Sequence, residues 1–132
     1  MLPRVAICNQ PSPAMKLDDY LKKLRDTPET VMLEDTLNTI DALYDFTPVA
    51  FSNGDLHNAV GEAPRSCRMY AFAQLHGLTE QQTLLGFGEH YREVLADPQG
   101  SSHRTIRIFM QLGWSGLKYQ GTPLTLRAAN PS

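Results

Sequence analysis

Apolar residues recur at every third or fourth position over most of the chain, a spacing typical of amphipathic helices. The first such stretch begins at Leu17. The second follows Thr27-Pro28-Glu29, where a hydroxyl, a proline and an acid mark a helix start. The third, from Ser66 to His76, is apolar on nearly all sides, so we expect it at the centre of the domain. The core side chains expected from the first two stretches are Leu17, Tyr20, Leu21, Leu24, Leu33, Leu37, Ile40 and Tyr44.

A fourth helix is predicted from Thr79, which can form a capping box with Gln82, to Asp97. Gly86 and Gly88 lie inside it, and each costs roughly 1 kcal/mol relative to alanine. We therefore expect another backbone, that of the third helix, to approach closely there. The core face of this helix is expected to comprise Leu84, Phe87, Tyr91, Val94 and Leu95.

The rest of the chain adds a fifth helix and little regular structure. Ser102 can cap the helix, which turns Ile106, Phe109 and Met110 inward and ends at Gly113. Residues 55–65, which follow Gly54, contain one glycine and one proline without periodicity and are expected to be a loop. Short strands are expected at 49–51 and 117–119, which pair with each other unless 117–119 folds back on 124–126. The predicted fold is a mainly α bundle of about five helices with a minor two-stranded β element, with α+β as the alternative.

Length and composition fit one domain. The chain has 132 residues, of which 42% are hydrophobic and 20% charged, an ordinary globular composition. Residues 1–15 contain three prolines and no acid and are expected to be a flexible tail, followed by a helical domain over 16–126 and a frayed end over 127–132. Two cysteines are too few for a disulfide scaffold, which favours a reducing compartment.

Charge and hydropathy exclude two classes of partner. The net charge is −2, and the bases are dispersed, which is a poor footprint for nucleic acid. No stretch approaches the roughly 20 apolar residues that span a bilayer. Residues 27–46 carry five acids and no base, whereas residues from 98 onward carry four bases and no acid. This asymmetry either orients a partner or joins two surfaces of one fold.

Cys67 is the side chain best suited to nucleophilic chemistry. It follows Ser66, the expected helix cap, where the helix dipole stabilises a thiolate, and His57, His90 or His103 could act as its general base. The alternative is a small buried apolar residue, since free cysteine is among the most buried residue types. We expect the buried alternative because no nucleophile signature surrounds Cys67.

His103 is the second catalytic candidate. It is expected in the first turn of the fifth helix, where the dipole disfavours the charged imidazole. A neutral ring suits a general base, and it also suits a structural bridge to the preceding loop, which we favour. Binding is therefore favoured over catalysis. The four histidines show no metal-site spacing, and no nucleotide motif occurs, so neither a metal nor a cofactor is predicted.

The candidate binding residues are two arginines, two aromatic residues and one asparagine. Arg104 and Arg107 share a face of the fifth helix with Trp114 just beyond it, a composition common at interfaces. The alternative is that the arginines pair with the acidic second helix and that Trp114 is core. Asn53, in the Ser52-Asn53-Gly54 turn, and Tyr91 complete the set.

Several blocks of the chain together resemble the HopJ (HopPmaJ-like) family of bacterial proteins over residues 16–124. The similarity is carried, in order, by Asp45-Phe46-Thr47-Pro48, Phe51-Ser52-Asn53-Gly54, Ser66-Cys67-Arg68, Tyr70-Ala71-Phe72-Ala73-Gln74-Leu75, the run from Thr83 to Arg92, His103 with Ile106-Arg107, Phe109 and Gly113-Trp114. The chain departs from the family pattern at Ser102, where the family tends to have an acid, at Thr105, where it tends to have asparagine, and at Ala63-Pro64-Arg65.

The resemblance implies a type III effector of a plant-associated bacterium. Such a protein is made in the bacterial cytoplasm and exported into a host cell, with residues 1–15 as its secretion signal and a host protein as its partner. The resemblance implies no reaction and no catalytic residue. Two alternatives remain open: a bacterial cytosolic protein with a small-molecule pocket between the third, fourth and fifth helices, or an enzyme that uses Cys67 and a histidine.

Overall fold

The computed structural model describes residues 13–126, with side chains from Leu17 onward. The predicted tail over 1–15 lies outside the described residues up to Ser12, and the predicted frayed end over 127–132 lies outside them entirely. In chain order the elements are α2 (Pro13–Asp26), η1 (Pro28–Thr30), α3 (Leu33–Leu43), β1 (Tyr44–Phe46), β2 (Phe51–Asn53), β3 (Leu56–Asn58), α4 (Pro64–Leu75), α5 (Glu80–Gly86), α6 (Glu89–Ala96), α7 (Arg104–Leu112), η2 (Gly113–Gly116), β4 (Leu117–Tyr119) and β5 (Leu124–Leu126).

The predicted bundle of five helices with one two-stranded element is wrong in its count of elements. The described residues form six α-helices and five strands in two small sheets, although the fold remains mainly helical. The extra helix comes from the predicted fourth helix, which is two helices, α5 and α6. Thr27-Pro28-Glu29 begins the short 3-10 helix η1, and the second predicted helix proper, α3, starts only at Leu33.

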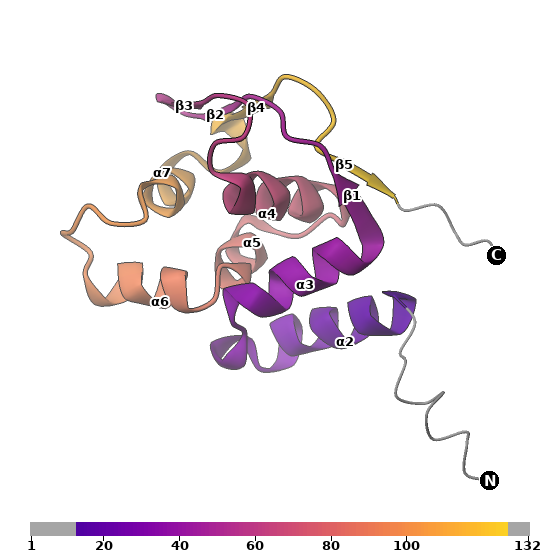
Figure 1. Ribbon diagram of the computed structural model, residues 1–132. Helices are drawn as coiled ribbons and strands as arrows, with labels where there is room; N and C mark the ends of the chain where they lie inside the picture. Colours follow the sequence, from indigo (N-terminus) through magenta and orange to yellow (C-terminus); the bar gives the residue numbers. More distant parts are fainter. Residues whose placement is uncertain (1–12, 127–132) are drawn as a thin grey trace, which may run out of the picture.

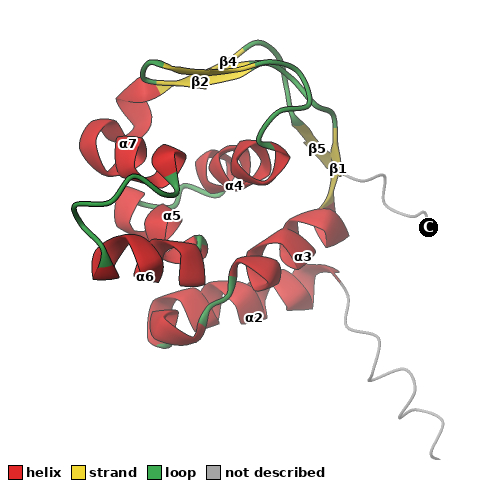
Figure 2. Cartoon of the chain, turned by 60° about the vertical axis from the view of Figure 1, so that its left-hand side comes forward, coloured by secondary structure: helices red, strands yellow, loops and turns green. Residues whose placement is uncertain are grey.

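Helix α4 lies at the centre of the molecule, as its apolar sequence predicts. Tyr70 and Phe72 are fully buried, and Cys67, Met69 and Ala73 are at most 1% exposed. The side-by-side pair α2 and α3 covers one flank of α4, while α5, α6 and α7 cover the other (Figure 1). Strands β2 and β4 lie over the remaining side of α4, opposite to α2, whereas β1 and β5 lie beside the end of α3 (Figure 2). The part of α4 that is enclosed in this way, from Cys67 to Ala73, is therefore mostly apolar.

Two antiparallel sheets join the middle of the chain to its C-terminal part. In the three-stranded sheet the order is β3-β2-β4, and Phe51 pairs with Tyr119, which confirms the predicted pairing of 49–51 with 117–119. In the second sheet β1 pairs with β5, Tyr44 opposite Leu126. Strand β3 lies within 55–65, which was expected to be a loop; it pairs with β2 across the Gly54-Asp55 turn.

The break between α5 and α6 has a steric cause at Gly88. This residue has φ +62°, and a Cβ there would lie 2.5 Å from the backbone nitrogen of Leu33. Close backbone approach is therefore confirmed, but the partner is the start of α3 rather than the third predicted helix. A Cβ on Gly86 would instead meet the side chain of Met69 on α4, at 2.8 Å.

The starts of the helices were predicted with mixed success. Thr79 and Gln82 form the expected capping box of α5, and Gly113 ends α7. Ser66 and Ser102 do not cap α4 and α7. The capping positions belong to Ala63 and His103, which have φ of 47° and 50°, the non-glycine residues with positive φ in the described part of the chain.

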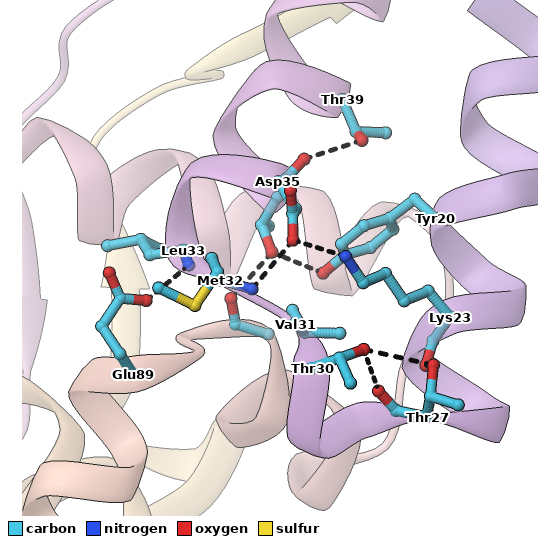
Figure 3. A network of polar contacts seen from close by, with 12 residues as sticks. Tyr20, Lys23, Thr27, Thr30, Val31, Met32, Leu33, Asp35, Thr39 and Glu89 are labelled. Carbon is cyan, nitrogen blue, oxygen red and sulfur yellow. Dashed lines mark hydrogen bonds and ion pairs between the residues drawn. The ribbon is translucent and has the colours of Figure 1, made fainter.

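Polar side chains connect α2, α3 and α5 through a chain of buried hydrogen bonds. The Thr36 hydroxyl donates to the Gly86 carbonyl (2.7 Å), so the Tyr20 hydroxyl donates to Thr36 Oγ1 (2.7 Å). Burial raises the pKa of Tyr20 to about 12, which keeps the phenol protonated as this donation requires. Beside it, Asp35 accepts from Lys23 (3.0 Å) and from the backbone N–H of Met32 (2.9 Å), and so caps α3 (Figure 3).

Two residues expected in the core are at the surface. Leu95 is 53% exposed and Met110 is 44% exposed, and they flank a surface groove of about 310 Å³ between α6 and α7. The remaining predicted core residues of α5–α7 are buried: Leu84, Phe87, Tyr91, Val94, Ile106 and Phe109.

Candidate functional site

Cys67, the first catalytic candidate, is inside the core. Its side chain is 1% exposed, and burial raises the pKa of the thiol to about 11, against the smaller opposing effects of a Val49 backbone hydrogen bond and the Arg68 charge. The thiolate expected from the helix dipole is therefore not favoured. Its neighbour Tyr119 has a raised pKa from burial as well, and its hydroxyl is buried without a hydrogen-bond partner. This part of the core offers no activated nucleophile.

His103, the second candidate, occupies the position before α7 rather than its first turn. Its Nε2 lies 2.6 Å from Oε1 of Glu93 on α6, so the ring acts as a bridge, but to a helix and not to the preceding loop. Because a carboxylate only accepts, Nε2 carries the hydrogen of this bond. The ring also stacks obliquely on His90, with centroids 4.6 Å apart.

The other predicted binding residues are spread over the molecule. Arg104 is exposed, whereas Tyr91 is 7% exposed and belongs to the core. Asn53 is fully buried and donates through Nδ2 to the carbonyl and hydroxyl oxygens of Thr105, both at 2.9 Å. Trp114 is half-buried and packs edge-on against Phe109.

Arg107 holds the loop between α6 and α7. Its guanidinium donates to the backbone carbonyls of Asp97, Pro98 and Ser102. It does not reach the acidic face of α3, where Arg68 makes the ion pair instead, with Asp41 at 2.8 Å. The loop that Arg107 holds ends at His103, so this arginine fixes where α7 begins.

The structure brings His103 and His90 together in a small cavity that we call the histidine pocket. Its volume is about 110 Å³. The polar part of the lining comes from Arg65, Ser66, His90, His103 and Thr105. The walls are completed by the apolar side chains of Leu33, Phe87 and Ile106.

A larger depression adjoins this pocket, and we call it the charged groove. Its volume is about 410 Å³, and it shares Leu33, Arg65 and His90 with the histidine pocket. The remaining lining residues are Glu34, Leu37, Asn38, Asp41, Arg68 and Glu89. The two depressions form one continuous candidate site between α3, α4, α6 and α7.

Helix starts dominate this site. Leu33 is the first residue of α3, Arg65 and Ser66 are in the first turn of α4, His90 in that of α6 and Thr105 in that of α7. The positive ends of helix dipoles thus face the same space. One of these ends is already occupied, because Oε1 of Glu89 accepts from the backbone N–H of Leu33 at 2.9 Å (Figure 3).

The electrostatics of the site favour a neutral His90. Burial lowers the pKa of His90, and the charges of His103 and Arg65 lower it further, against the raising effects of Glu89 and Glu93. The pKa of Glu89 is also low: burial would raise it, but the Leu33 hydrogen bond and the nearby His90 and Arg92 charges outweigh burial. Burial is therefore the main cause of the low pKa of His90, and the surrounding bases and acids act on it in opposite directions.

Sequence reasoning missed most of this site. It named His103 and, as a partner for Cys67, His90, but it did not connect the two histidines with each other or with Arg65, Ser66 and Thr105. The available signal was that each of these residues stands at or just after a helix start, which an anion-binding site exploits.

Within the described part of the chain, no group of three or more His, Cys, Asp or Glu side chains is placed to hold a metal ion. In the same residues, no helix has both the length and the apolar character needed to cross a bilayer.

Comparison with known proteins gives one family and one solved structure. Residues 17–124 match the model of a family described as "HopJ type III effector protein". The crystal structure titled "unknown function protein VPA0580" superimposes with a TM-score of 0.81 at 39% identity, covering 84% of this chain and 93% of that one. Comparison with curated proteins finds no match. Because the family model covers most of the chain, and the blocks that carry the resemblance lie within it, this protein belongs to the HopJ type III effector family.

Proposed function

We propose that this protein is an effector of a plant-associated bacterium, exported into host cells, where its folded domain acts by binding a host protein without catalysing a reaction. The observation that carries the proposal is the family match over residues 17–124. The stretch before the match, residues 1–16, contains no acid and is the segment we propose for recognition by the secretion machinery.

The structure supports binding over catalysis. The strongest nucleophile candidate, Cys67, is buried with a raised pKa. By contrast, the charged groove presents acids and bases side by side along α3 and α4, with Glu34, Asn38 and Asp41 exposed on one wall. Mixed charge on a concave surface provides specificity and fast association with a partner of complementary charge. We therefore place the partner in the charged groove.

Export is tested with a translocation reporter fused to the whole chain. A secretion-competent strain should deliver the fusion into plant cells, and removal of residues 2–12 should abolish delivery while leaving every described element in place. A fusion over residues 1–50 should be delivered as well. Lack of delivery of the whole-chain fusion would refute the effector role.

Binding is tested by affinity capture from plant cells with a matched pair of charge reversals. Glu34→Lys changes an exposed acid that lines the groove, and Glu29→Lys changes an exposed acid on η1 that does not. The captured host protein should be lost with Glu34→Lys and retained with Glu29→Lys. Equal capture by both variants would place the partner elsewhere on the molecule.

A further inference from the structure

We propose that the histidine pocket binds a tetrahedral oxyanion of the phosphoryl class. This inference names the ligand chemistry of the proposed site, and it rests on the proposed function only for the claim that a host protein carries the group. It concerns the small pocket, whereas the charged groove would hold the rest of the partner.

The polar residues that line the pocket carry hydrogen-bond donors, and no Asp or Glu is among them. Arg65 contributes a guanidinium, Ser66 a hydroxyl and His90 and His103 ring nitrogens, while the hydroxyl of Thr105 already accepts from Asn53. A guanidinium combined with hydroxyl and imidazole donors is the set that phosphoryl oxygens prefer.

The two nearest carboxylates are already engaged. Oε1 of Glu89 accepts from the backbone of Leu33, and Oε1 of Glu93 accepts from His103. The second bond fixes the proton of His103 on Nε2 and leaves Nδ1 as the remaining polar atom of the ring.

Of the charged groups around His90, the two bases line the pocket, whereas the acids lie outside its lining. Arg65 and His103 face His90 from α4 and from the start of α7, Glu89 and Glu93 from its own helix, and Glu34 from the groove wall on α3. The two bases lower the pKa of His90 in addition to the effect of burial. A bound oxyanion would offset their repulsion and raise the pKa of His90 again.

The size and position of the pocket fit a phosphoryl group at the end of a longer ligand. A volume of about 110 Å³ accommodates a tetrahedral anion but not a nucleotide or a peptide. The apolar side chains of Leu33, Phe87 and Ile106 lower the local dielectric constant, which strengthens charge–charge attraction in the pocket. Because the groove shares Leu33, Arg65 and His90, a segment in the groove would present a phosphorylated side chain to the pocket.

The test is a titration of the full chain with inorganic phosphate, followed by NMR of the histidine rings and backbone amides. Resonances of His90, His103, Ser66 and Thr105 should shift with one shared dissociation constant, and the exposed His57 should not move. Phosphate should also raise the pKa of His90. Shifts of His57 as large as those of His90, or none in the pocket, would overturn the proposal.

Variants separate the pocket from general charge attraction. Arg65→Gln and Ser66→Ala should each weaken phosphate binding at least about fivefold. Lys22→Gln, which removes one positive charge from an exposed position on α2, should leave the dissociation constant unchanged. Thermal unfolding confirms that each variant is folded, and equal weakening by Arg65→Gln and Lys22→Gln would overturn the proposal.

A second arm distinguishes the source of the phosphoryl group. N-acetyl-O-phosphoserine amide should bind at least as tightly as phosphate if a partner protein carries the group, and tenfold more weakly if the pocket serves free phosphate. N-acetylserine amide should produce no shift in the pocket, and equal binding of both serine derivatives would refute the oxyanion. Phosphate binding by a chain that is not delivered into plant cells would refute the proposed function and leave this inference intact.

Discussion

Replacement of Gly88 by alanine tests the contact that separates α5 from α6. Gly88 has φ +62° and ψ −128°, a sparsely populated conformation that costs an L-residue roughly 1–2 kcal/mol. A Cβ would also lie 2.5 Å from the Leu33 nitrogen and 2.7 Å from the Met32 carbonyl carbon. Both atoms are backbone, so α3 or α6 must move, at a further cost of about 1–3 kcal/mol. We expect a total of about 2–5 kcal/mol, a large share of the roughly 5–15 kcal/mol of a typical domain.

Gly77→Ala is the matched control. Gly77 has φ +65°, but nothing lies within 4 Å of the position that its Cβ would take, so only the conformational cost applies. Urea unfolding followed by circular dichroism gives both free energies of unfolding. The free energy of unfolding should fall clearly more in Gly88→Ala than in Gly77→Ala. Relative to the unsubstituted protein, the melting temperature of Gly88→Ala should be lower by roughly 6–15 °C. Equal losses of unfolding free energy in the two variants would show that a Cβ at position 88 does not clash with the start of α3. The steric explanation for the break between α5 and α6 would then fail.

Three further predictions concern the network beside α3 and the core thiol. Asp35→Ala should cost about 1 kcal/mol at pH 7 because it removes the cap of α3. The pKa of Asp35 is low because its hydrogen bonds and the Lys23 charge outweigh burial. The loss of unfolding free energy in Asp35→Ala should therefore shrink as the pH falls below about 4. Equal losses at pH 7 and pH 2.5 in urea unfolding would contradict this. Thr36→Val should cost about 2–4 kcal/mol in the same assay, since two buried groups lose their partner, whereas a cost below 1 kcal/mol would refute the buried hydrogen-bond chain. In a Cys8→Ser background, Cys67 should react with an alkylating reagent at least about a hundredfold more slowly than a free thiol at pH 8 and at the free-thiol rate in urea; fast reaction in the native state would restore the nucleophile hypothesis.

The elements that local chemistry determines could be predicted from the sequence. The all-apolar stretch around Tyr70 is the buried central helix, and the Thr79–Gln82 capping box starts α5. In both cases the residues that determine the element lie within the element itself or next to it in the sequence. The family could also be identified from blocks of sequence, because several blocks in the right order are specific even when none has a known chemical role.

The errors share a different cause, which is contact between residues distant in sequence. Gly88 breaks a helix because the start of α3 lies against it, and a helical pattern cannot reveal that neighbour. Ser102 has the chemistry of a cap, yet His103 takes the position before α7 while pairing with Glu93. The histidine pocket depends on four helix starts from separate parts of the chain, so its residues could be named but not grouped.

The two small sheets have a consequence for synthesis of the protein. Strand β1 and one edge of β2 depend on partners that lie roughly seventy to eighty residues later, because Tyr44 pairs with Leu126 and Phe51 pairs with and stacks on Tyr119. A nascent chain that ends before β4 can form its helices but keeps the apolar face of β2 open to solvent and to other chains. Premature termination between Leu112 and Leu117 should therefore yield aggregating fragments, even though the central helix and its helical neighbours are complete.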